Sequence, residues 1–218
     1  MLAEREPVRI ACLISGGGTN LQALLDAQAS GALVSGHIAL VISDREEAYG
    51  LVRAEKSGCK AFAIPRKLHT RDAFEDQLLH ALQRERIELI VLAGFLQILS
   101  ERVIQAYPGR IINVHPSLIP SFCGEGYYGL RVHEAALARG VKITGATVHI
   151  VNEIPDGGPI LLQKAVDVFA CDTPETLQRR VMEQAEWILL PQAAELVSSR
   201  LLKGEPTLVY PYTEEKHG

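Results

Sequence analysis

Short apolar runs alternate with amphipathic helical patterns over the first half of the chain. Runs of strand length occupy residues 8–14, 37–42, 60–64, 88–93 and 111–114, and a helical pattern separates each run from the next. Strands that are joined through helices pair in parallel, and the helices then cover both faces of the sheet. The order therefore predicts an α/β fold with a mostly parallel, doubly wound, Rossmann-like sheet.

The pattern changes in the second half of the chain. Two long β-rich runs, at residues 142–152 and 158–169, are joined by a Pro-Asp-Gly turn, which predicts an antiparallel extension of the sheet. Thr173 as N-cap and Pro174 at the first helical position begin a long C-terminal helix. Its expected apolar positions include Leu177, Val181, Ile188, Ala193 and Val197. Residues 207–210 have the composition of a last short strand, and we expect a single domain over residues 1–218.

A glycine-rich turn, Ser15-Gly-Gly-Gly-Thr-Asn20, lies between the first strand and the helix that follows it. Free backbone N–H groups and the helix dipole make such a helix start a binding site for an anion. The alternative is a tight turn in which Thr19 or Asn20 caps the helix. Leu21 stands where a dinucleotide fingerprint has its third glycine, and the turn has no lysine for a triphosphate. The turn therefore suits a single phosphomonoester.

Residues 111–120 combine the end of a strand with polar side chains and two prolines. Open α/β sheets bind ligands outside the carboxyl ends of their strands. There Asn113 can donate a hydrogen bond to an oxyanion, and His115 can carry a proton near neutral pH. The alternative is that both side chains satisfy backbone groups of the loop. His149, in the middle of a strand, is interpreted as a structural histidine, and Asp156 has an ordinary place in a tight turn unless the fold brings it to an imidazole.

Other classes of site and of protein lack their signatures. No serine or cysteine lies in a nucleophile elbow, and no His, Asp or Glu cluster has the spacing of metal ligands, which favours direct transfer without a covalent intermediate or a metal. The four cysteines are scattered, as thiols in a reducing compartment are. The formal net charge of −4 argues against nucleic acid and anionic membranes as partners. With no membrane-spanning run and no signal-peptide pattern, we expect a cytoplasmic protein.

Three further segments are candidates for ligand contact. The apolar run at residues 94–99 either packs inside or lines a pocket for a flat hydrophobic ligand. Arg71, at the start of a helix, is either a surface charge or a group that binds an anionic part of a ligand. The glycine- and tyrosine-rich loop at residues 121–129 is typical of loops that cover active sites.

Four segments occur in the order and spacing of a known family. They are residues 15–22, 92–100, 113–120, and 147–153 together with 156–158. On these motifs the chain resembles the phosphoribosylglycinamide formyltransferases, which are folate-dependent formyltransferases of purine synthesis. The resemblance runs from about residue 8 to about residue 202. The Asn-x-His-Pro-Ser-Leu-x-Pro motif marks the wider formyltransferase group, and the phosphate loop with the short length indicates this family.

The resemblance implies roles for individual residues. The catalytic residues that it implies are Asn113, His115 and Asp156. The residues that it implies for the 5′-phosphate of the ribonucleotide are Gly18, Thr19 and Asn20. The implied folate contacts are Arg71, Leu96, Gln97, Ile98, Leu99, Asn113, Asn152, Glu153, Ile154, Pro155 and Asp156. The domain would then have a nucleotide phosphate-binding half at about residues 8–110 and a folate-binding and catalytic half at about residues 111–202.

Two positions depart from the family pattern. The segment from Arg180 to Glu186 is one residue longer than usual. Counting back from Pro191 makes Glu186 the ribose-binding acid, and Glu183 is the alternative. Many relatives carry arginine where this chain has Gln97, so a charge contact there would be lost and a backbone contact would be kept.

The resemblance also implies a reaction: transfer of the formyl group of 10-formyltetrahydrofolate to the amine of glycinamide ribonucleotide, without a metal. Asn113 and a protonated His115 would stabilise the oxyanion, and Asp156 would raise the pKa of His115 so that the ring stays a cation. The implied partners are these small molecules, with no nucleic acid and no membrane, and the chain would be a monomer or a homodimer. Two alternatives stay open: another formyl-tetrahydrofolate enzyme, such as a hydrolase, and a nucleotide-binding module without catalysis.

Overall fold

The computed structural model describes residues 5–207. Its strands are β1 (Val8–Ile14), β2 (Gly36–Ser43), β3 (Ala61–Ala63), β4 (Leu89–Leu92), β5 (Ile111–His115), β6 (Ile143–Ile150) and β7 (Ile160–Asp167). Its α-helices are α1 (Thr19–Ser30), α2 (Tyr49–Lys56), α3 (Arg71–Arg84), α4 (Glu101–Ala106), α5 (Leu130–Arg139), α6 (Pro174–Val181) and α7 (Trp187–Lys203). Two short helical turns complete the described elements: the 3-10 turn η1 (Arg66–Leu68) and the π-helical turn η2 (Met182–Glu186).

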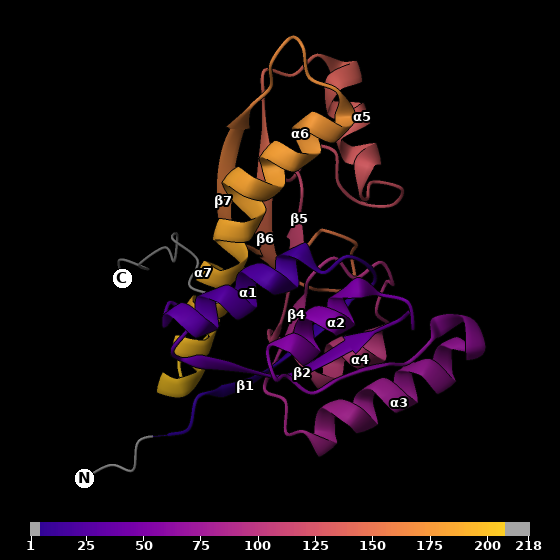
Figure 1. Cartoon of the computed structure of the whole chain (residues 1–218), viewed down its shortest axis with the longest axis vertical. Coiled ribbons are helices and arrows are strands. Elements are labelled where there is room, and N and C mark those ends of the chain that lie inside the picture. Colours follow the sequence, from indigo (N-terminus) through magenta and orange to yellow (C-terminus); the bar gives the residue numbers. More distant parts are fainter. Residues whose placement is uncertain (1–4, 208–218) are drawn as a thin grey trace, which may run out of the picture.

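The strands form one seven-stranded sheet in the order β3-β2-β1-β4-β5-β6-β7 (Figure 1). The four pairs from β3 to β5 are parallel, whereas β6 runs antiparallel to both β5 and β7. The predicted fold class is thus confirmed, including the antiparallel extension. Because β1, β4 and β5 run in the same direction, the loops that follow them leave the sheet at one edge.

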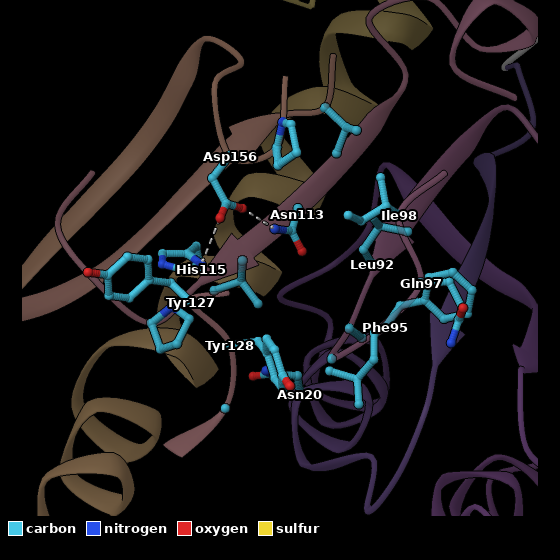
Figure 2. Close-up of a pocket in the computed structure, with 18 of the residues that line it drawn as sticks. Asn20, Leu92, Phe95, Gln97, Ile98, Asn113, His115, Tyr127, Tyr128 and Asp156 are labelled. Atoms are coloured by element: carbon cyan, nitrogen blue, oxygen red, sulfur yellow. Dashed lines mark hydrogen bonds and ion pairs between the residues drawn. The ribbon is translucent and has the colours of Figure 1, made fainter. Parts of the chain in front are cut away.

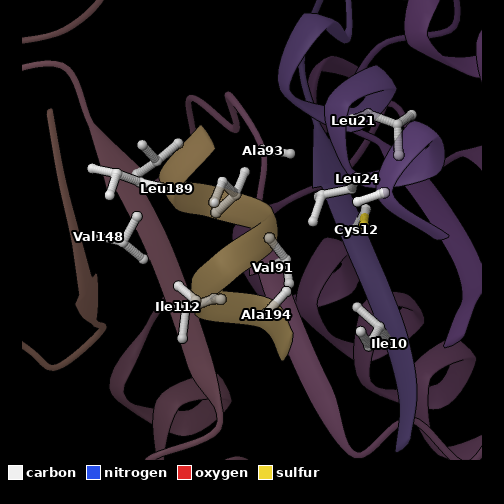
Figure 3. Close-up of a cluster of buried hydrophobic side chains, with 14 of the residues drawn as sticks. Ile10, Cys12, Leu21, Leu24, Val91, Ala93, Ile112, Val148, Leu189 and Ala194 are labelled. Carbon is white, nitrogen blue, oxygen red and sulfur yellow. The ribbon is translucent and has the colours of Figure 1, made fainter. Parts of the chain in front are cut away.

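Helices cover both faces of the sheet because the strand residues alternate between two apolar clusters. In β1, Ile10 and Cys12 belong to the first cluster, whereas Ala11 and Leu13 belong to the second. Helices α1, α2, α5, α6 and α7 contribute to the first cluster, and α3 and α4 contribute to the second. Figure 3 shows the first face, where α7 packs with Ala194 close to β4 and β5.

The long C-terminal helix is interrupted by the π-helical turn η2. Thr173 caps α6 and Pro174 is its first residue, as predicted. Four of the five predicted apolar positions are buried: Leu177, Val181, Ala193 and Val197. The fifth, Ile188, is 37% exposed. A π turn closes its hydrogen bonds over five residues rather than four, so the residues after it do not continue the face of α6.

Three properties of the described residues bear on the expectations above. Within residues 5–207, no helix is both long enough and apolar enough to cross a membrane. The same residues contain no group of three or more His, Cys, Asp or Glu side chains that could hold a metal ion. All four cysteines are free thiols. Residues 208–210 of the predicted last strand lie outside the described residues.

Candidate active site

Loops at the carboxyl edge of the parallel strands surround a cavity of about 670 Å³. A cavity of this size is typical of a site for small organic ligands. Its walls come from the turn after β1, the loop after β4, the end of β5, the loop at residues 124–129, the turn at residues 152–156, and η2. The fold therefore brings the predicted ligand-binding segments to one place.

The glycine-rich turn forms part of the cavity wall through residues 16–20. Gly18 is the N-cap of α1, with a left-handed φ of 71°, and no side chain caps this helix. The alternative in which Thr19 or Asn20 caps α1 is therefore wrong. Glycine is also required for close packing, because a Cβ on Gly18 would lie 2.6 Å from the Cα of Gly50 in α2. The uncapped start of α1 borders the cavity, where its backbone amides can bind an anion.

The two candidate ribose acids differ in position. Glu186 lines the cavity and is buried, and the amide Nδ2 of Asn20 donates to its carboxylate at 2.8 Å. Burial raises the pKa of Glu186 to about 7, although the hydrogen bond from Asn20 acts in the opposite direction. Glu183 does not line the cavity and forms an ion pair of 2.7 Å with Arg179 on the surface. The structure brings Glu186 to the glycine-rich turn and leaves Glu183 away from it.

Asn113 and His115 point to the same side of β5 because side chains alternate along a strand. Asp156 reaches this side from the turn that follows β6. One carboxylate oxygen of Asp156 lies 3.3 Å from Nδ1 of His115, and the other lies 3.5 Å from Nδ2 of Asn113. Figure 2 shows the three side chains converging in the cavity. The structure therefore brings the three predicted catalytic residues together.

Opposing effects set the pKa of His115. Burial lowers the pKa of His115, and the Asp156 carboxylate and the Phe122 carbonyl act in the opposite direction without cancelling that effect. Asp156 therefore acts on the pKa of His115 in the predicted direction, but in the ligand-free protein it does not outweigh burial. The second ring nitrogen, Nε2, lies 2.8 Å from the Phe122 carbonyl oxygen. The Asp156 carboxylate faces Nδ1 and the Phe122 carbonyl faces Nε2. When the His115 ring gains a proton, both of its N–H groups therefore have an acceptor, which stabilises the cation.

Asp156 is held in place by its backbone as well as by its contacts. Its φ of 55° lies in the left-handed region, which is costly for residues other than glycine and is found disproportionately at functional sites. The turn also requires Gly158, whose added Cβ would lie 1.8 Å from the carbonyl oxygen of Ile150. Burial alone would raise the pKa of Asp156, but its contacts with His149, with His115 and with the Gly124 amide outweigh burial and lower the pKa.

The segment after β4 contributes an apolar wall. Leu96 and Ile98 line the cavity and yet are 49% and 65% exposed, so a ligand there would cover them. Between them, the amide of Gln97 donates to the buried carboxylate of Asp44 at 2.7 Å. Arg71 does not line the cavity, and its guanidinium donates to the Ile98 carbonyl at 3.3 Å. Gln97 therefore binds a buried carboxylate through an uncharged amide.

The remaining predicted folate contacts border the same cavity. They are Leu99, Asn152, Glu153, Ile154 and Pro155. In this turn the side-chain oxygen of Asn152 accepts from the backbone N–H of Ile154 at 3.1 Å, as in an Asx turn. Ile154 is 64% exposed. Two apolar segments, one after β4 and one after β6, thus contribute exposed side chains to one cavity.

Two histidines at the site were not assigned there from the sequence. His149 lies with Nε2 3.2 Å from Nδ2 of Asn113 and 3.5 Å from the Asp156 carboxylate. His133 of α5 is buried and lines the cavity, and neither of its ring nitrogens has a hydrogen-bond partner in the described part of the chain. Burial lowers the pKa of His133 to about 4. The signal for His149 is the strand register, because it is the direct antiparallel partner of Asn113.

Comparison with known proteins gives a consistent set of relatives. The sequence model of a family described as "Formyl transferase" matches residues 8–193. The phosphoribosylglycinamide formyltransferase of Haemophilus influenzae is 39% identical over 203 residues, which cover 93% of this chain and 92% of that protein. The trifunctional purine biosynthetic protein adenosine-3 of Bos taurus is 43% identical over 192 residues, and the match spans 88% of this chain but 18% of that protein.

A solved structure agrees with these matches. The glycinamide ribonucleotide transformylase 1 of Symbiobacterium toebii has a TM-score of 0.84 and 41% sequence identity, with 91% of each chain covered. The family match over residues 8–193 includes all seven strands of the described sheet and the segments that border the cavity.

Proposed function

The chain belongs to the formyl transferase family, and from this we propose that it is a phosphoribosylglycinamide formyltransferase. It transfers the formyl group of 10-formyltetrahydrofolate to the amine of glycinamide ribonucleotide, a reaction of purine biosynthesis. The observation that carries the proposal is the meeting of Asn113, His115 and Asp156 in a cavity that also includes the uncapped start of α1. An amide, an imidazole and a carboxylate thus share a cavity with a helix start whose backbone amides suit a phosphate.

The two substrates occupy different parts of this cavity in the proposal. The 5′-phosphate binds the amides of Gly18, Thr19 and Asn20 at the start of α1, and the ribose hydroxyls bind the carboxyl group of Glu186. The folate lies between residues 96–99 and residues 152–156, where apolar side chains are exposed to the cavity. This arrangement holds the ribonucleotide amine next to the formyl carbon, and such orientation lowers the entropic part of the barrier.

The proposed chemistry requires no covalent enzyme intermediate. The amine nitrogen attacks the formyl carbon, and the carbonyl oxygen becomes an oxyanion that accepts a hydrogen bond from Asn113. The neutral ring of His115 takes the proton that the amine loses and returns it to the folate nitrogen when the carbon–nitrogen bond to folate breaks. While it is charged, the ring is stabilised by the Asp156 carboxylate at 3.3 Å. The products are the formamide of the ribonucleotide and tetrahydrofolate.

The proposal also includes the setting of the reaction. The partners are the two small molecules, the location is the cytoplasm, and the enzyme is a monomer or a homodimer, as expected from the sequence. Sedimentation at several protein concentrations would distinguish the two oligomeric states.

An assay of tetrahydrofolate formation tests the proposed function. With the purified chain and 10-formyltetrahydrofolate, product formation should require glycinamide ribonucleotide. Equal rates with and without the ribonucleotide would instead identify a hydrolase. Binding of the ribonucleotide without any turnover would identify a nucleotide-binding module. Either of these results would overturn the proposal.

A further inference from the structure

His149 contacts the amide of Asn113 across the sheet. The two residues are direct partners in the antiparallel ladder between β5 and β6, so their side chains extend from the same face. Nδ2 of Asn113 lies 3.2 Å from Nε2 of His149, and the imidazole ring is 1% exposed. Both residues lie on strands that pair with a neighbour on each side, which gives this contact a rigid base.

The other ring nitrogen of His149 determines which nitrogen carries the proton. Nδ1 lies 2.9 Å from the carbonyl oxygen of Ile150. A carbonyl oxygen only accepts hydrogen bonds, so Nδ1 must carry a hydrogen. In a neutral ring Nε2 then has a lone pair, and a lone pair is the partner that the N–H of Asn113 requires.

The surroundings of the Asn113 amide agree with this assignment. Its nitrogen faces Nε2 of His149 and the carboxylate of Asp156 at 3.5 Å, and that carboxylate also lies 3.5 Å from Nε2. If the amide were flipped, its oxygen would face the Asp156 carboxylate and be repelled by it, so the competing arrangement, with a hydrogen on Nε2 directed at Asp156, leaves the amide oxygen in an unfavourable place. Figure 2 shows the amide nitrogen of Asn113 on the side of Asp156 and the amide oxygen turned away from it.

We propose that His149 is a positioning residue that acts through Asn113. As a neutral hydrogen-bond acceptor, it fixes the amide so that the nitrogen faces the space among Asn113, His115 and Asp156, where the formyl group reacts. This inference rests on the proposed formyl transfer. An amide has one donating end and one accepting end, and only the donating end stabilises an oxyanion.

One N–H of Asn113 is used by His149, and the second remains for the substrate. In the ligand-free structure the nearest acceptor for this second N–H is the Asp156 carboxylate, at the long distance of 3.5 Å. A formyl oxygen in the cavity can replace that weak contact. Without the acceptor on His149, the amide is free to rotate, and part of the population would present its oxygen to the oxyanion.

The first test measures the tautomer of His149 in the unmodified protein. In a ¹⁵N-labelled sample near neutral pH, two-bond nitrogen–proton correlations distinguish the protonated from the bare ring nitrogen, and the missing signal of His149→Gln assigns the residue. We expect a proton on Nδ1 and a bare Nε2. A proton on Nε2, either in the other tautomer or in the cation, would overturn the proposal, because the ring could then not accept from Asn113.

The second test separates positioning from a general structural role. His149→Leu removes the acceptor, and we expect it to lower kcat by about 10²-fold, with a much smaller change in the KM for the ribonucleotide. His149→Gln should restore most of this loss, since its carbonyl oxygen can accept at the position of Nε2. Equal losses in both variants would contradict the proposal.

A double-mutant cycle with Asn113→Ala completes the test. If His149 acts only through Asn113, then His149→Leu should cost no more than about twofold when the amide is absent. A further loss of about 10²-fold in that background would overturn the proposal. If His149→Leu does not fold, the tautomer measurement still decides the question. If the wild-type protein has no ribonucleotide-dependent turnover, the proposed function fails independently of the tautomer.

Discussion

Replacing Glu186 by glutamine should change how the stability of the ligand-free protein depends on pH. Burial raises the pKa of Glu186 from 4.5 in the unfolded chain to about 7 in the folded protein. A group with a raised folded-state pKa binds its proton more tightly in the folded state. Its contribution to stability is therefore complete at a pH below 4.5 and is lost as the pH rises through about 7.

The size of the effect follows from the two pKa values. Each unit of difference between the two pKa values corresponds to about 1.4 kcal/mol of unfolding free energy. The full slope applies only at pH values between the two pKa values. From about pH 5 to about pH 8, ionisation of Glu186 should cost the wild-type protein about 2.5 kcal/mol of unfolding free energy. Glutamine has the same shape and can accept from Asn20, but it has no proton to lose. Glu186→Gln should therefore gain about 2.5 kcal/mol relative to wild type over this range.

Urea denaturation at several pH values between about pH 5 and about pH 8 measures this difference. The difference between variant and wild type isolates Glu186, because the other titrating groups are common to both. Glu183→Gln is the matched control, since Glu183 is on the surface and paired with Arg179, and its curve should run close to that of the wild type. Parallel curves for the wild type and Glu186→Gln would refute the reasoning.

Three further predictions concern the cavity. His115→Ala and Asp156→Asn should lower kcat by about 10²–10³-fold and leave the far-UV circular dichroism unchanged; near wild-type rates at saturating substrates would remove both residues from the mechanism. The pKa of His133 is lowered from 6.5 to about 4, so its contribution to stability is present above pH 6.5 and is lost as the pH falls through about 4. In urea denaturation, His133→Leu should therefore reduce the loss of stability on acidification by up to about 3 kcal/mol, and an unchanged slope would contradict the assignment. Gly18→Ala should weaken phosphate binding, measured by calorimetry with the ribonucleotide, because the new methyl group would collide with Gly50; unchanged affinity would contradict the role of the turn.

Most of the fold could be predicted because its signals are local. Apolar runs with helical patterns between them predict parallel strands, and the Pro-Asp-Gly turn predicts the antiparallel pair, as the sheet confirms. The placement of Asn113 and His115 on one side of β5 also follows from local alternation. The approach of Asp156 does not, because it depends on how the turn after β6 folds back over the end of β5.

The features that the sequence could not supply depend on burial and on register. The pKa of His115 is set mainly by the loss of solvent, which no spacing of residues reveals. The contact of His149 with Asn113 depends on which residues of β5 and β6 lie opposite each other. Ile188 is exposed although it is apolar, because η2 interrupts the helical period between α6 and α7. A single-domain organisation remains a prediction.

The π-helical turn η2 makes the C-terminal helix tolerant of a change in length at one point. Five residues, Met182 to Glu186, occupy this wide turn, and α6 and α7 on either side each keep their own buried face. A relative with one residue fewer can close the turn to an ordinary α-helical one without shifting either helix along the sheet. One residue fewer inside η2 would shorten the spacing between α6 and Glu186 by one residue. Glu186 would still lie next to Asn20 and at the same spacing from Pro191. An alignment of relatives should therefore open its gap inside η2, and a chain shortened there by one residue should still fold.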